Sequence, residues 1–386
     1  MGRVCVRDLI FSGVEEVVVA DRDEDGAREV AGSARGRGMA WAQGADATDH
    51  DSLVEILGPA DVVANCTNYA LNVAVMRAAA AAGTDYLDLG GLYRGTNAQA
   101  DIASEITSAG IICLLGMGST PGTMNVMAAW GAERLDEVHE IHLRCGGNDP
   151  QPPTASLPAP YAIDTILDEF TLPGVALVDG ELGEIEPASQ DEMFDFPEPV
   201  GDQLAIATLH SELASMPETF RDRGVKEVTF KVAFGETFIH NYRIVCELGL
   251  AATAPVELAD GTTVVPRALL KQLALAEPQV FSGQDIESLV VVLRGTKAGR
   301  PHEVRVEEVS RPNELFGVGG ADVNTGMPPS IVAQMIARGE VKGRGVCFPE
   351  QVVPPAPYLD ELRSRGMSIG ISEREPSEMP LRVRRS

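Results

Sequence analysis

The feature that most constrains this chain is the spacing between a glycine near its start and an acidic residue after its first apolar run. Gly2 is followed almost at once by Val4–Leu9, whose pattern predicts an amphipathic helix, and the apolar run Val17–Ala20 then ends in Asp21. In a nucleotide-binding βαβ unit, the last glycine of GxGxxG opens the helix, and an acidic residue follows about 20 positions later at a strand tip. Gly2 and Asp21 therefore predict a dinucleotide-binding unit.

The first strand and the first two glycines of that motif are missing from the sequence before Gly2. We expect that the true start lies upstream or that the chain is truncated. On this expectation the chain as given binds NAD weakly, and roughly ten added residues encoding a strand and GxGxx tighten binding. Loss of a central parallel strand would also leave two strand edges unpaired.

Up to about residue 125 the chain alternates apolar strands with helical stretches. The predicted strands are Val17–Ala20, Met39–Gln43, Asp61–Cys66, Asp85–Leu89 and Gly110–Leu115; the predicted helices include Asp25–Ala34, Ser52–Leu57, Asn72–Ala82 and Asn97–Ser108. This alternation predicts a doubly wound parallel (Rossmann-like) sheet that lacks its first strand. Ligands bind beyond the carboxyl ends of such strands, so the following loops should line one crevice.

From about residue 140 the sequence pattern changes and predicts longer strands in which apolar and polar residues alternate. These are Glu227–Phe234, Tyr242–Gly249, Leu289–Thr296 and Glu303–Val309, with a helix at Arg267–Ala276. They predict an open, mostly antiparallel sheet. A later helix is expected over Pro328–Arg338, with Pro328 or Pro329 in its first turn, and a frayed, arginine-rich tail from Glu373. The expected parts are 1–125 (NAD(P) binding), 126–320 (an α+β substrate and dimerisation domain) and 321–386 (a segment folding back on the first).

Composition excludes several classes of function. The net charge of −26 argues against nucleic acid and anionic membranes. No apolar run reaches the length of about 18 residues that a membrane span needs. The start has no basic-then-apolar signal pattern, which favours the cytoplasm. The six cysteines are scattered without CxxC spacing, so reduced buried thiols are expected.

Cofactor contacts are expected at the strand ends of the first part. The helix end at Gly2 suits a phosphate. Asp21 would accept hydrogen bonds from the ribose hydroxyls, and its charge would repel a 2′-phosphate. The alternative is that Asp21 is a solvated acidic residue at the end of a strand. Arg22 could stack on adenine or pair with a phosphate, so NAD is predicted and NADP is not excluded. Asp46 would reach the adenine amine or simply cap a helix. Small polar residues beside the expected ribose and nicotinamide complete the set: Asn65, Cys66 and Thr67.

Substrate contacts are expected in the next loops along the same edge. The candidates are Tyr69, Asn72, Gly90, Gly91, Pro121 and Gly122. Paired glycines permit positive φ and close approach to a ligand. The Pro-Gly turn offers N–H groups to a substrate carboxylate or the cofactor amide, or is only a domain crossover. Asp88, at a strand end, would hold a substrate ammonium as a catalytic residue or would cap the following turn.

The most reactive group in the second part is His210-Ser211-Glu212. No Ser-His-Asp triad is expected, because adjacent residues in a strand or helix do not face one another. His210, with Glu212 nearby, is a candidate acceptor for a proton from an amine, and an interface histidine is the alternative. His139 and His142 alternate as in a strand, so no metal site is predicted there.

Several segments resemble the saccharopine dehydrogenase superfamily, and most closely its lysine 6-dehydrogenase branch. They are MGRVCVRDL, VVVADRD, ADVVANCTNYALNVAV, GTDYLDLGG, GMGSTPGTMNVMA, YAIDTILDEFTLPG, TLHSELASMP and RGVCFPEQVVP. LDLGG followed by GxxPG and a helix is moderately specific. The resemblance implies an NAD(P)-binding domain, a second α/β domain for substrate and dimerisation, and a C-terminal segment that folds back.

The function expected from this resemblance is an NAD-dependent oxidoreductase acting on a C–N bond of an amino acid or amine. Oxidative deamination of the lysine ε-amino group is one form. One alternative is the reductive condensation of an amine with a keto acid, of the saccharopine or carboxynorspermidine type. The other is a catalytically inactive protein, because the GxGxxG motif is incomplete. The expected partners are a small-molecule substrate and further copies of the chain as a homo-oligomer.

Overall fold

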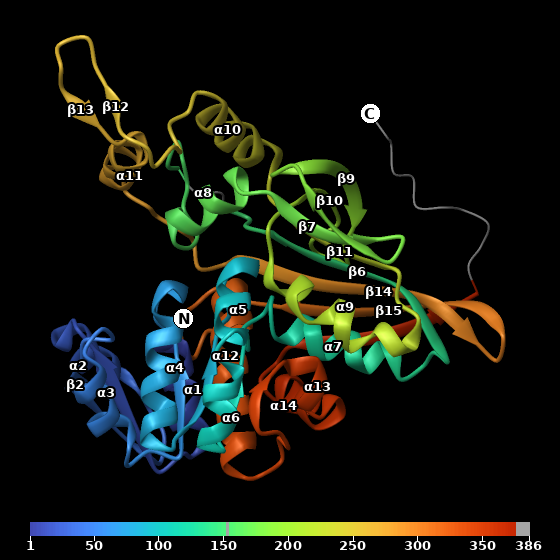
Figure 1. The fold of residues 1–386 in the computed structure, drawn as a ribbon, viewed down its shortest axis with the longest axis horizontal. Helices are drawn as coiled ribbons and strands as arrows, with labels where there is room; N and C mark the ends of the chain where they lie inside the picture. Colours follow the sequence, from blue (N-terminus) through green and yellow to red (C-terminus); the bar gives the residue numbers. More distant parts are fainter. Residues whose placement is uncertain (152–153, 376–386) are drawn as a thin grey trace.

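The computed structural model describes residues 1–151 and 154–375, and its N-terminal part alternates strands and helices as predicted (Figure 1). Its strands are β1 (Glu16–Asp21), β2 (Met39–Gly44), β3 (Val62–Asn65), β4 (Asp85–Asp88) and β5 (Ile112–Leu114). Its helices are α1 (Gly2–Ser12), α2 (Glu24–Ser33), α3 (His50–Leu57), η1 (Tyr69–Leu71), α4 (Asn72–Ala82), α5 (Tyr93–Ala100) and α6 (Ala103–Ala109). The single helix expected over Asn97–Ser108 is wrong, because the chain turns between α5 and α6 and buries Ile106 completely.

The parallel strands of this part form two sheets. One contains β2 and β1, and the other has the order β16-β5-β4-β3, where β16 is Gly345–Cys347. Within the described residues, β1 pairs only with β2 and β3 only with β4. This is the predicted Rossmann-like fold, with its parallel strands divided at β1 and β3.

The second part is built on a nine-stranded mixed sheet with the order β17-β15-β14-β6-β11-β10-β9, to which β7 and β8 are attached. The strands are β6 (Glu137–Asn148), β7 (Gly174–Val178), β8 (Glu181–Ile185), β9 (Ser189–Asp195), β10 (Asp202–Ala207), β11 (Glu227–Ala233), β14 (Ile286–Lys297), β15 (Arg300–Ser310) and β17 (Ser368–Arg374). Only the β6–β11 pair is parallel, so the sheet is mostly antiparallel, as predicted.

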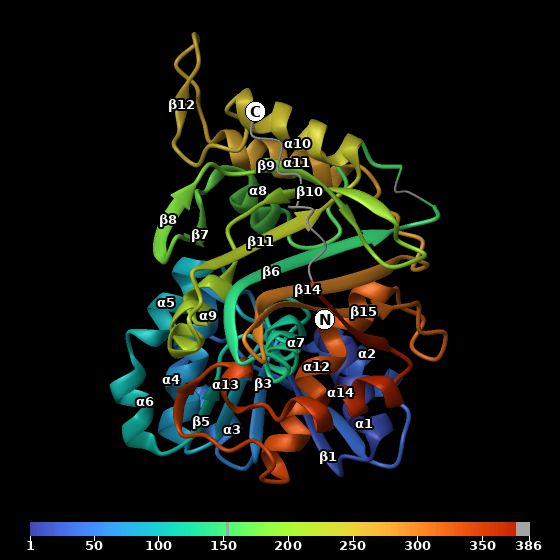
Figure 2. The same ribbon diagram turned by 90° about the vertical axis from the view of Figure 1, so that its right-hand side faces the viewer.

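Helices cover both faces of this sheet (Figures 1 and 2). They are α7 (Thr123–Ala132), α8 (Ile163–Thr171), η2 (Ser211–Ala214), α9 (Met216–Thr219), η3 (Arg221–Arg223), α10 (Glu236–Glu247), α11 (Pro266–Ala276), α12 (Gly320–Ala337), α13 (Pro349–Val352) and α14 (Pro355–Ser364). A small hairpin, β12 (Val256–Glu257) and β13 (Thr263–Val264), projects beside α11 in Figure 1. None of the helices in the described ranges is long and apolar enough to cross a membrane.

Two predictions for the second part are wrong. Tyr242–Gly249 was expected to be a strand, but it lies mainly in the helix α10, where Ile239 and Tyr242 are buried one helical turn apart. The helix expected to begin at Pro328 begins at Gly320, so both prolines lie inside α12. Proline inside a helix is costly, and the burial of the surrounding residues of α12 offsets that cost.

One hydrophobic core joins the two parts of the molecule. It includes Leu87 of β4, Met124 of α7, Leu143 of β6, Leu293 of β14 and Met335 of α12. In Figure 1, α12 lies between the large sheet and the N-terminal part, and it contacts α1, β3 and β4 as well as β14 and β15. The helix α7 lies between the sheet and the helices α13 and α14.

The C-terminal segment contributes to both parts. The helix α12 and the strand β16 pack with the first part, whereas β17 pairs with β15 in the large sheet. Glu373, where a frayed tail was expected to begin, lies within β17, and most of that tail falls outside the described residues. The division at residues 125 and 320 stays a prediction.

Candidate active site

The start of α1 lies against the loop that follows β3. The helix begins at Gly2 and has no side-chain cap. A Cβ at residue 2 would lie 3.3 Å from the Cβ of Cys66. This tight approach and the uncapped N–H groups of a helix N-terminus are the features that a bound phosphate requires.

The acidic residue at the end of β1 keeps acceptor capacity for a ligand. Asp21 is exposed, and its Oδ1 accepts one hydrogen bond from the Asp23 N–H at 2.9 Å. Its second carboxylate oxygen is available for a ribose hydroxyl. Arg22, the next residue, is also exposed.

Asp46 has a local structural role. Its Oδ1 accepts hydrogen bonds from the N–H of Thr48 at 2.8 Å and from the Thr48 hydroxyl at 2.7 Å. The N-cap of α3 is Asp49, which accepts from the Ser52 N–H. The geometry therefore favours a turn-forming role for Asp46 over contact with adenine.

Asp88 is the centre of a buried network. Its side chain is completely buried, and its Oδ2 accepts from the Tyr86 hydroxyl at 2.8 Å and from Gln99 Nε2 at 2.6 Å. Its Oδ1 accepts from the N–H groups of Gly90 and Gly116, each at 2.8 Å. Burial raises the pKa of Asp88 despite these four donors. The arrangement favours the turn-capping alternative, because Asp88 joins the loops after β4 and β5.

The same network includes two asparagines predicted to touch ligands. Asn65 Nδ2 donates to Asn72 Oδ1 at 2.9 Å and to the Tyr86 hydroxyl at 3.1 Å. Asn65 Oδ1 accepts from the Thr67 hydroxyl at 2.7 Å, and Asn72 Nδ2 donates to the Gly90 carbonyl at 3.3 Å. Both asparagines are buried, and Thr67 is exposed. The asparagines position the loops, and Thr67 is the member that faces outward.

Close packing explains the paired glycines. A Cβ on Gly90, whose φ is 91°, would lie 2.5 Å from Pro121 Cγ, and one on Gly91 would lie 3.1 Å from Tyr69 Cβ. Gly122 has a φ of 129°, which side chains rarely adopt. These five predicted substrate residues therefore bring together the loops that follow β3, β4 and β5.

Tyr69 links the two parts of the molecule. Its hydroxyl donates to Asp168 Oδ2 at 3.0 Å, and Asp168 Oδ1 accepts from Arg267 at 2.6 Å. Burial and the neighbouring Asp168 raise the pKa of Tyr69 to about 12. The phenol therefore stays protonated and fastens the loop after β3 to α8.

His210 and Glu212 form the most reactive arrangement in the molecule. His210 Nδ1 is hydrogen-bonded to Glu212 Oε2, and the Thr120 hydroxyl donates to Glu212 Oε1. Glu212 is completely buried, and the His210 ring stacks on Phe230 with centroids 3.9 Å apart. Thr120 lies in the loop after β5, so this chain of bonds runs from the first part of the fold to the second.

The contact between His210 and Glu212 corrects the sequence argument that such close neighbours do not face one another. His210 has an extended backbone, with φ −144° and ψ 156°, and the chain then turns into η2. This change of conformation brings the side chain of residue 212 back to the imidazole. A uniform strand or helix, which the argument assumed, does not occur here.

Glu169 is a further acidic residue near His210 that the sequence analysis missed. It lies on α8 among the buried residues Ile166 and Phe170, and it accepts a hydrogen bond from the Tyr161 hydroxyl at 2.5 Å. Burial raises the pKa of Glu169 to about 7, although His210 opposes this shift. An acidic residue on an apolar helix face was the available signal.

The pKa of His210 is set by opposing effects. Burial disfavours the imidazolium, but attraction to Glu212, the hydrogen bond to Glu212 and attraction to Glu169 together raise the pKa above its ordinary value. His210 therefore carries a proton at neutral pH more often than an isolated histidine does.

Another buried carboxyl group with a raised pKa, besides Asp88 and Glu169, lies on β15. Glu308 is completely buried and accepts from Ser310 Oγ at 2.6 Å and from Asn324 Nδ2 at 2.9 Å. Burial raises its pKa from 4.5 to about 8. A carboxyl with a raised pKa in the folded state stabilises the fold fully below its unfolded pKa, and this contribution is lost as pH rises through the folded pKa.

We therefore expect the free energy of unfolding to fall by a few kcal/mol between about pH 5 and pH 9. Chemical denaturation at a series of pH values measures this. Glu308→Gln should weaken the dependence of the free energy of unfolding on pH, because the amide does not titrate. Glu307→Gln, on the opposite face of the same strand, is the matched control and should retain the pH dependence of the wild type. A wild-type stability that is constant over this range would contradict the assignment.

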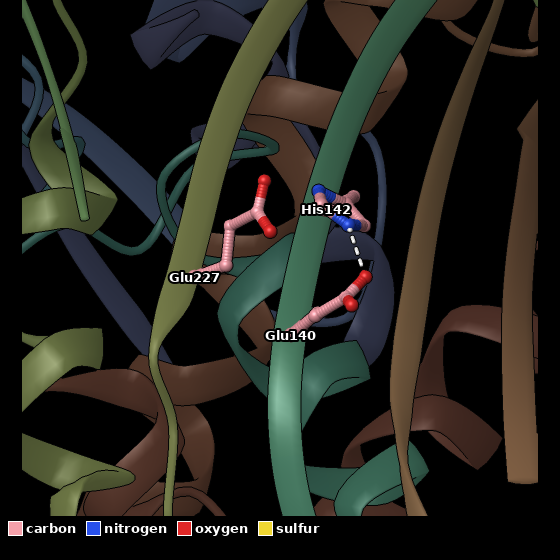
Figure 3. Close-up of side chains that lie close together, drawn as sticks. All are labelled: Glu140, His142 and Glu227. Carbon is pink, nitrogen blue, oxygen red and sulfur yellow. Dashed lines mark hydrogen bonds and ion pairs between the residues drawn. The ribbon is translucent and has the colours of Figure 1, made fainter. Parts of the chain in front are cut away.

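A third cluster, Glu140, His142 and Glu227, lies on β6 and β11 (Figure 3). Its ligand atoms lie within 4.8 Å of one another, which is close enough for a metal ion. However, His142 Nε2 bonds to Glu140 Oε2 at 3.0 Å and Nδ1 to the Thr229 hydroxyl at 2.9 Å, while Arg294 donates to the same Glu140 oxygen at 2.9 Å. The hydrogen bond from His142 and the charge of Arg294 lower the pKa of Glu140 to about 2. The guanidinium already supplies the cation here, so we assign the cluster a structural role.

Comparison with known proteins agrees with this architecture. Carboxynorspermidine synthase of Vibrio alginolyticus is 25% identical over 371 residues, which cover 87% of this chain and 84% of the relative. Carboxyaminopropylagmatine dehydrogenase of Synechocystis is 26% identical over 324 residues, which cover 80% and 78%. The structure of yeast saccharopine dehydrogenase (L-Glu forming) superposes with a TM-score of 0.75 at 16% identity, covering 97% and 98% of the two chains.

Two family models account for nearly the whole chain. The saccharopine dehydrogenase NADP binding domain matches residues 1–114, and the saccharopine dehydrogenase C-terminal domain matches residues 118–367. The match to an NADP binding domain also agrees with the predicted nicotinamide cofactor. The chain belongs to the saccharopine dehydrogenase family.

Proposed function

We propose that this protein is a nicotinamide-dependent oxidoreductase that joins an amine to a carbonyl carbon in the reductive direction. The observation that carries the proposal is the bonded series His210–Glu212–Thr120, which places a protonatable imidazole beside the loop after β5. Two of the relatives are named carboxynorspermidine synthase, which supports the reductive direction. Oxidative deamination of the lysine ε-amine remains the alternative that the sequence suggests.

The residues at the proposed cofactor site fit a dinucleotide. The N-terminus of α1 approaches the loop after β3 closely at Gly2, and Asp21 Oδ2 accepts no hydrogen bond from the residues that the structure describes. Thr67 is exposed at the end of β3. When bound there, the nicotinamide ring would supply the hydride that reduces the substrate.

His210 is proposed as the proton donor. Its Nδ1 is bonded to Glu212, so Nε2 is the nitrogen that remains for the substrate. Attack of an amine on a carbonyl carbon gives a carbinolamine, whose hydroxyl must be protonated before it leaves as water. An imidazolium suits this step, and attraction to Glu212, which raises the pKa of His210, favours that form. Glu212 holds the ring in place and stabilises its charge.

The direction of the reaction is testable with the purified protein. We expect oxidation of the reduced cofactor when an amine and a keto acid are supplied together. Absorbance at the nicotinamide band measures this. Reduction of NAD by lysine at a higher rate, with no reductive reaction, would instead establish the oxidative alternative.

Asp21 is expected to set the preference for NAD over NADP, because its charge would repel a 2′-phosphate. Asp21→Ser should narrow the ratio of kcat/KM values for the two cofactors by at least about tenfold. Asp25→Ser on α2 removes the same charge nearby and serves as the control. A wild-type protein that uses NADP better than NAD would refute this prediction and transfer the selectivity to Arg22.

A further inference from the structure

The segment Arg344–Pro354, which carries the sequence RGVCFPEQVVP, has no part in the chemistry proposed above. It forms β16 and α13, and α13 contacts both α7 and α9. The helix α7 follows the loop that carries Thr120, and α9 follows the turn that carries Glu212. A buried acidic residue of α13, Glu350, therefore lies close to both halves of the proposed reaction centre.

The carboxyl group of Glu350 joins α7 to α9. Its Oε2 accepts a hydrogen bond from Asn125 Nδ2 at 2.8 Å, and its Oε1 accepts one from the Thr219 hydroxyl at 3.2 Å. Burial raises the pKa of Glu350, and the hydrogen bonds donated to its oxygens oppose this shift. A carboxyl group has two acceptor oxygens on one rigid unit, so it can hold donors from two helices at a fixed separation.

On the α7 side, the contact continues into the loop after β5. Asn125 is buried, and its Oδ1 accepts from the Gly122 N–H at 3.0 Å, so both ends of its amide are engaged. Gly122 has a φ of 129°, and this hydrogen bond helps to hold that uncommon conformation. Thr120, two residues earlier, donates its hydroxyl to Glu212. Glu350 therefore supports, through Asn125, the loop that presents Thr120.

On the α9 side, the contact leads back to the backbone of Glu212. The Thr219 N–H donates to the Ser215 carbonyl at 2.9 Å, and the Ser215 N–H donates to the Glu212 carbonyl at 3.3 Å. Gln351, next to Glu350, donates to the Thr219 hydroxyl at 2.9 Å. Because Thr120 bonds to the Glu212 side chain, the two sides close into one hydrogen-bonded ring that contains Glu350 and Glu212.

We propose that Glu350 is a positioning residue of the reaction centre, which fixes the Thr120 hydroxyl and the Glu212 carboxylate relative to each other and thereby holds Glu212 beside His210. This inference rests on the proposed function, because it concerns the same proton donor. Glu350 acts through Asn125 and Thr219, which receive its two hydrogen bonds. Its role is to maintain geometry, since a small displacement of a reacting group lowers a rate strongly.

The first test compares two variants of Glu350 in steady-state assays. Glu350→Ala removes both acceptors and should lower kcat of the reductive reaction by about ten- to a hundredfold. KM for the reduced cofactor should stay within about twofold of wild type, because Gly2 and Asp21 lie outside the ring. Glu350→Gln can accept from Asn125 and donate to Thr219, so it should restore most of the rate. A glutamine variant as slow as the alanine variant would show that the charge matters and would overturn the positioning role.

Coupling to Thr120 separates positioning from a general loss of stability. Thr120→Val removes the hydroxyl that bonds to Glu212, so adding Glu350→Ala to it should change kcat by no more than about twofold. Losses that multiply in the double variant would contradict the proposal. Glu303→Gln is the control, because Glu303 is also a buried glutamate, paired with Arg294 and Arg374 on β15. It should lower the melting temperature and leave kcat unchanged.

A second measurement does not depend on turnover. The charged groups that act on His210 are Glu212 and Glu169, and NMR titration of the imidazole reports its pKa. Glu350→Ala should lower this pKa, because Glu212 is no longer held beside the ring, whereas Glu350→Gln and Glu303→Gln should leave it unchanged.

The two proposals can fail separately. Thr219→Val breaks one of the two hydrogen bonds of Glu350 and keeps the side-chain volume, so it should show smaller changes of the same kind even where the alanine variant does not fold. An unaltered pKa of His210 in both Glu350→Ala and Thr219→Val would overturn the positioning role. The expected pKa changes in a protein without cofactor-dependent turnover would support the positioning role and refute the reductive reaction.

Discussion

His210→Ala is expected to lower turnover by about a hundred- to ten-thousandfold near neutral pH. The alanine variant loses the imidazole that is bonded to Glu212 and stacked on Phe230, and with it the proposed proton donor. Steady-state rates of cofactor oxidation measure the loss. His240→Ala removes an exposed histidine from α10 and is the control, which should retain full activity.

The pH dependence separates a proton donor from a structural residue. In the reductive direction the imidazolium is the active form, so wild-type kcat should fall as pH rises through the raised pKa of His210. In the oxidative direction the neutral imidazole must accept a proton, so the rate should rise over the same range. The alanine variant should lack this dependence in either direction.

Glu212→Gln provides a second test of the same pair. The amide keeps a hydrogen bond to the ring but removes the charge that raises the pKa of His210. The pH at which the reductive rate falls should therefore move downward. Identical pH profiles for wild type, His210→Ala and Glu212→Gln would assign both residues to structure, and Glu169 would become the next residue to test.

The order of secondary structure in the first part was predictable because its signals are local. Apolar runs such as Val17–Ala20 and Asp61–Cys66 are short and bounded, and helices lie between them. The second part was less predictable. The sequence Tyr242–Gly249 mixes apolar and polar residues in a way that fits a strand, and only burial of Ile239 and Tyr242 against the rest of the fold makes it a helix.

The sequence predicts which loops form the candidate site, but it predicts the role of each residue in those loops less well. Position along the sequence places Asp88 and Asn65 at strand ends, where ligands bind. It does not reveal whether their polar atoms face a ligand or one another. Glu169 lies on α8 and Glu308 on β15, and only the tertiary fold shows that both are buried and have raised pKa values.

Asp88 illustrates this difference and leads to the second large effect. The four hydrogen bonds to its carboxylate come from the side chains of Tyr86 and Gln99 and from the backbone of Gly90 and Gly116. Asp88→Asn would turn an NH₂ group toward two of these donors and leave them unsatisfied. We expect the free energy of unfolding to fall by about 3–5 kcal/mol, as for other broken buried charge networks.

Thermal or urea unfolding measures that loss, and Asp101→Asn, at an exposed position after α5, should remain within about 0.5 kcal/mol of wild type. The alternative role of Asp88, holding a substrate ammonium, makes the opposite prediction. In that case Asp88→Asn would fold with nearly normal stability and would raise KM for the amine. Because Asp88 is completely buried and its oxygens already accept four hydrogen bonds, the destabilised protein is the expected result, with the loops after β4 and β5 released from one another.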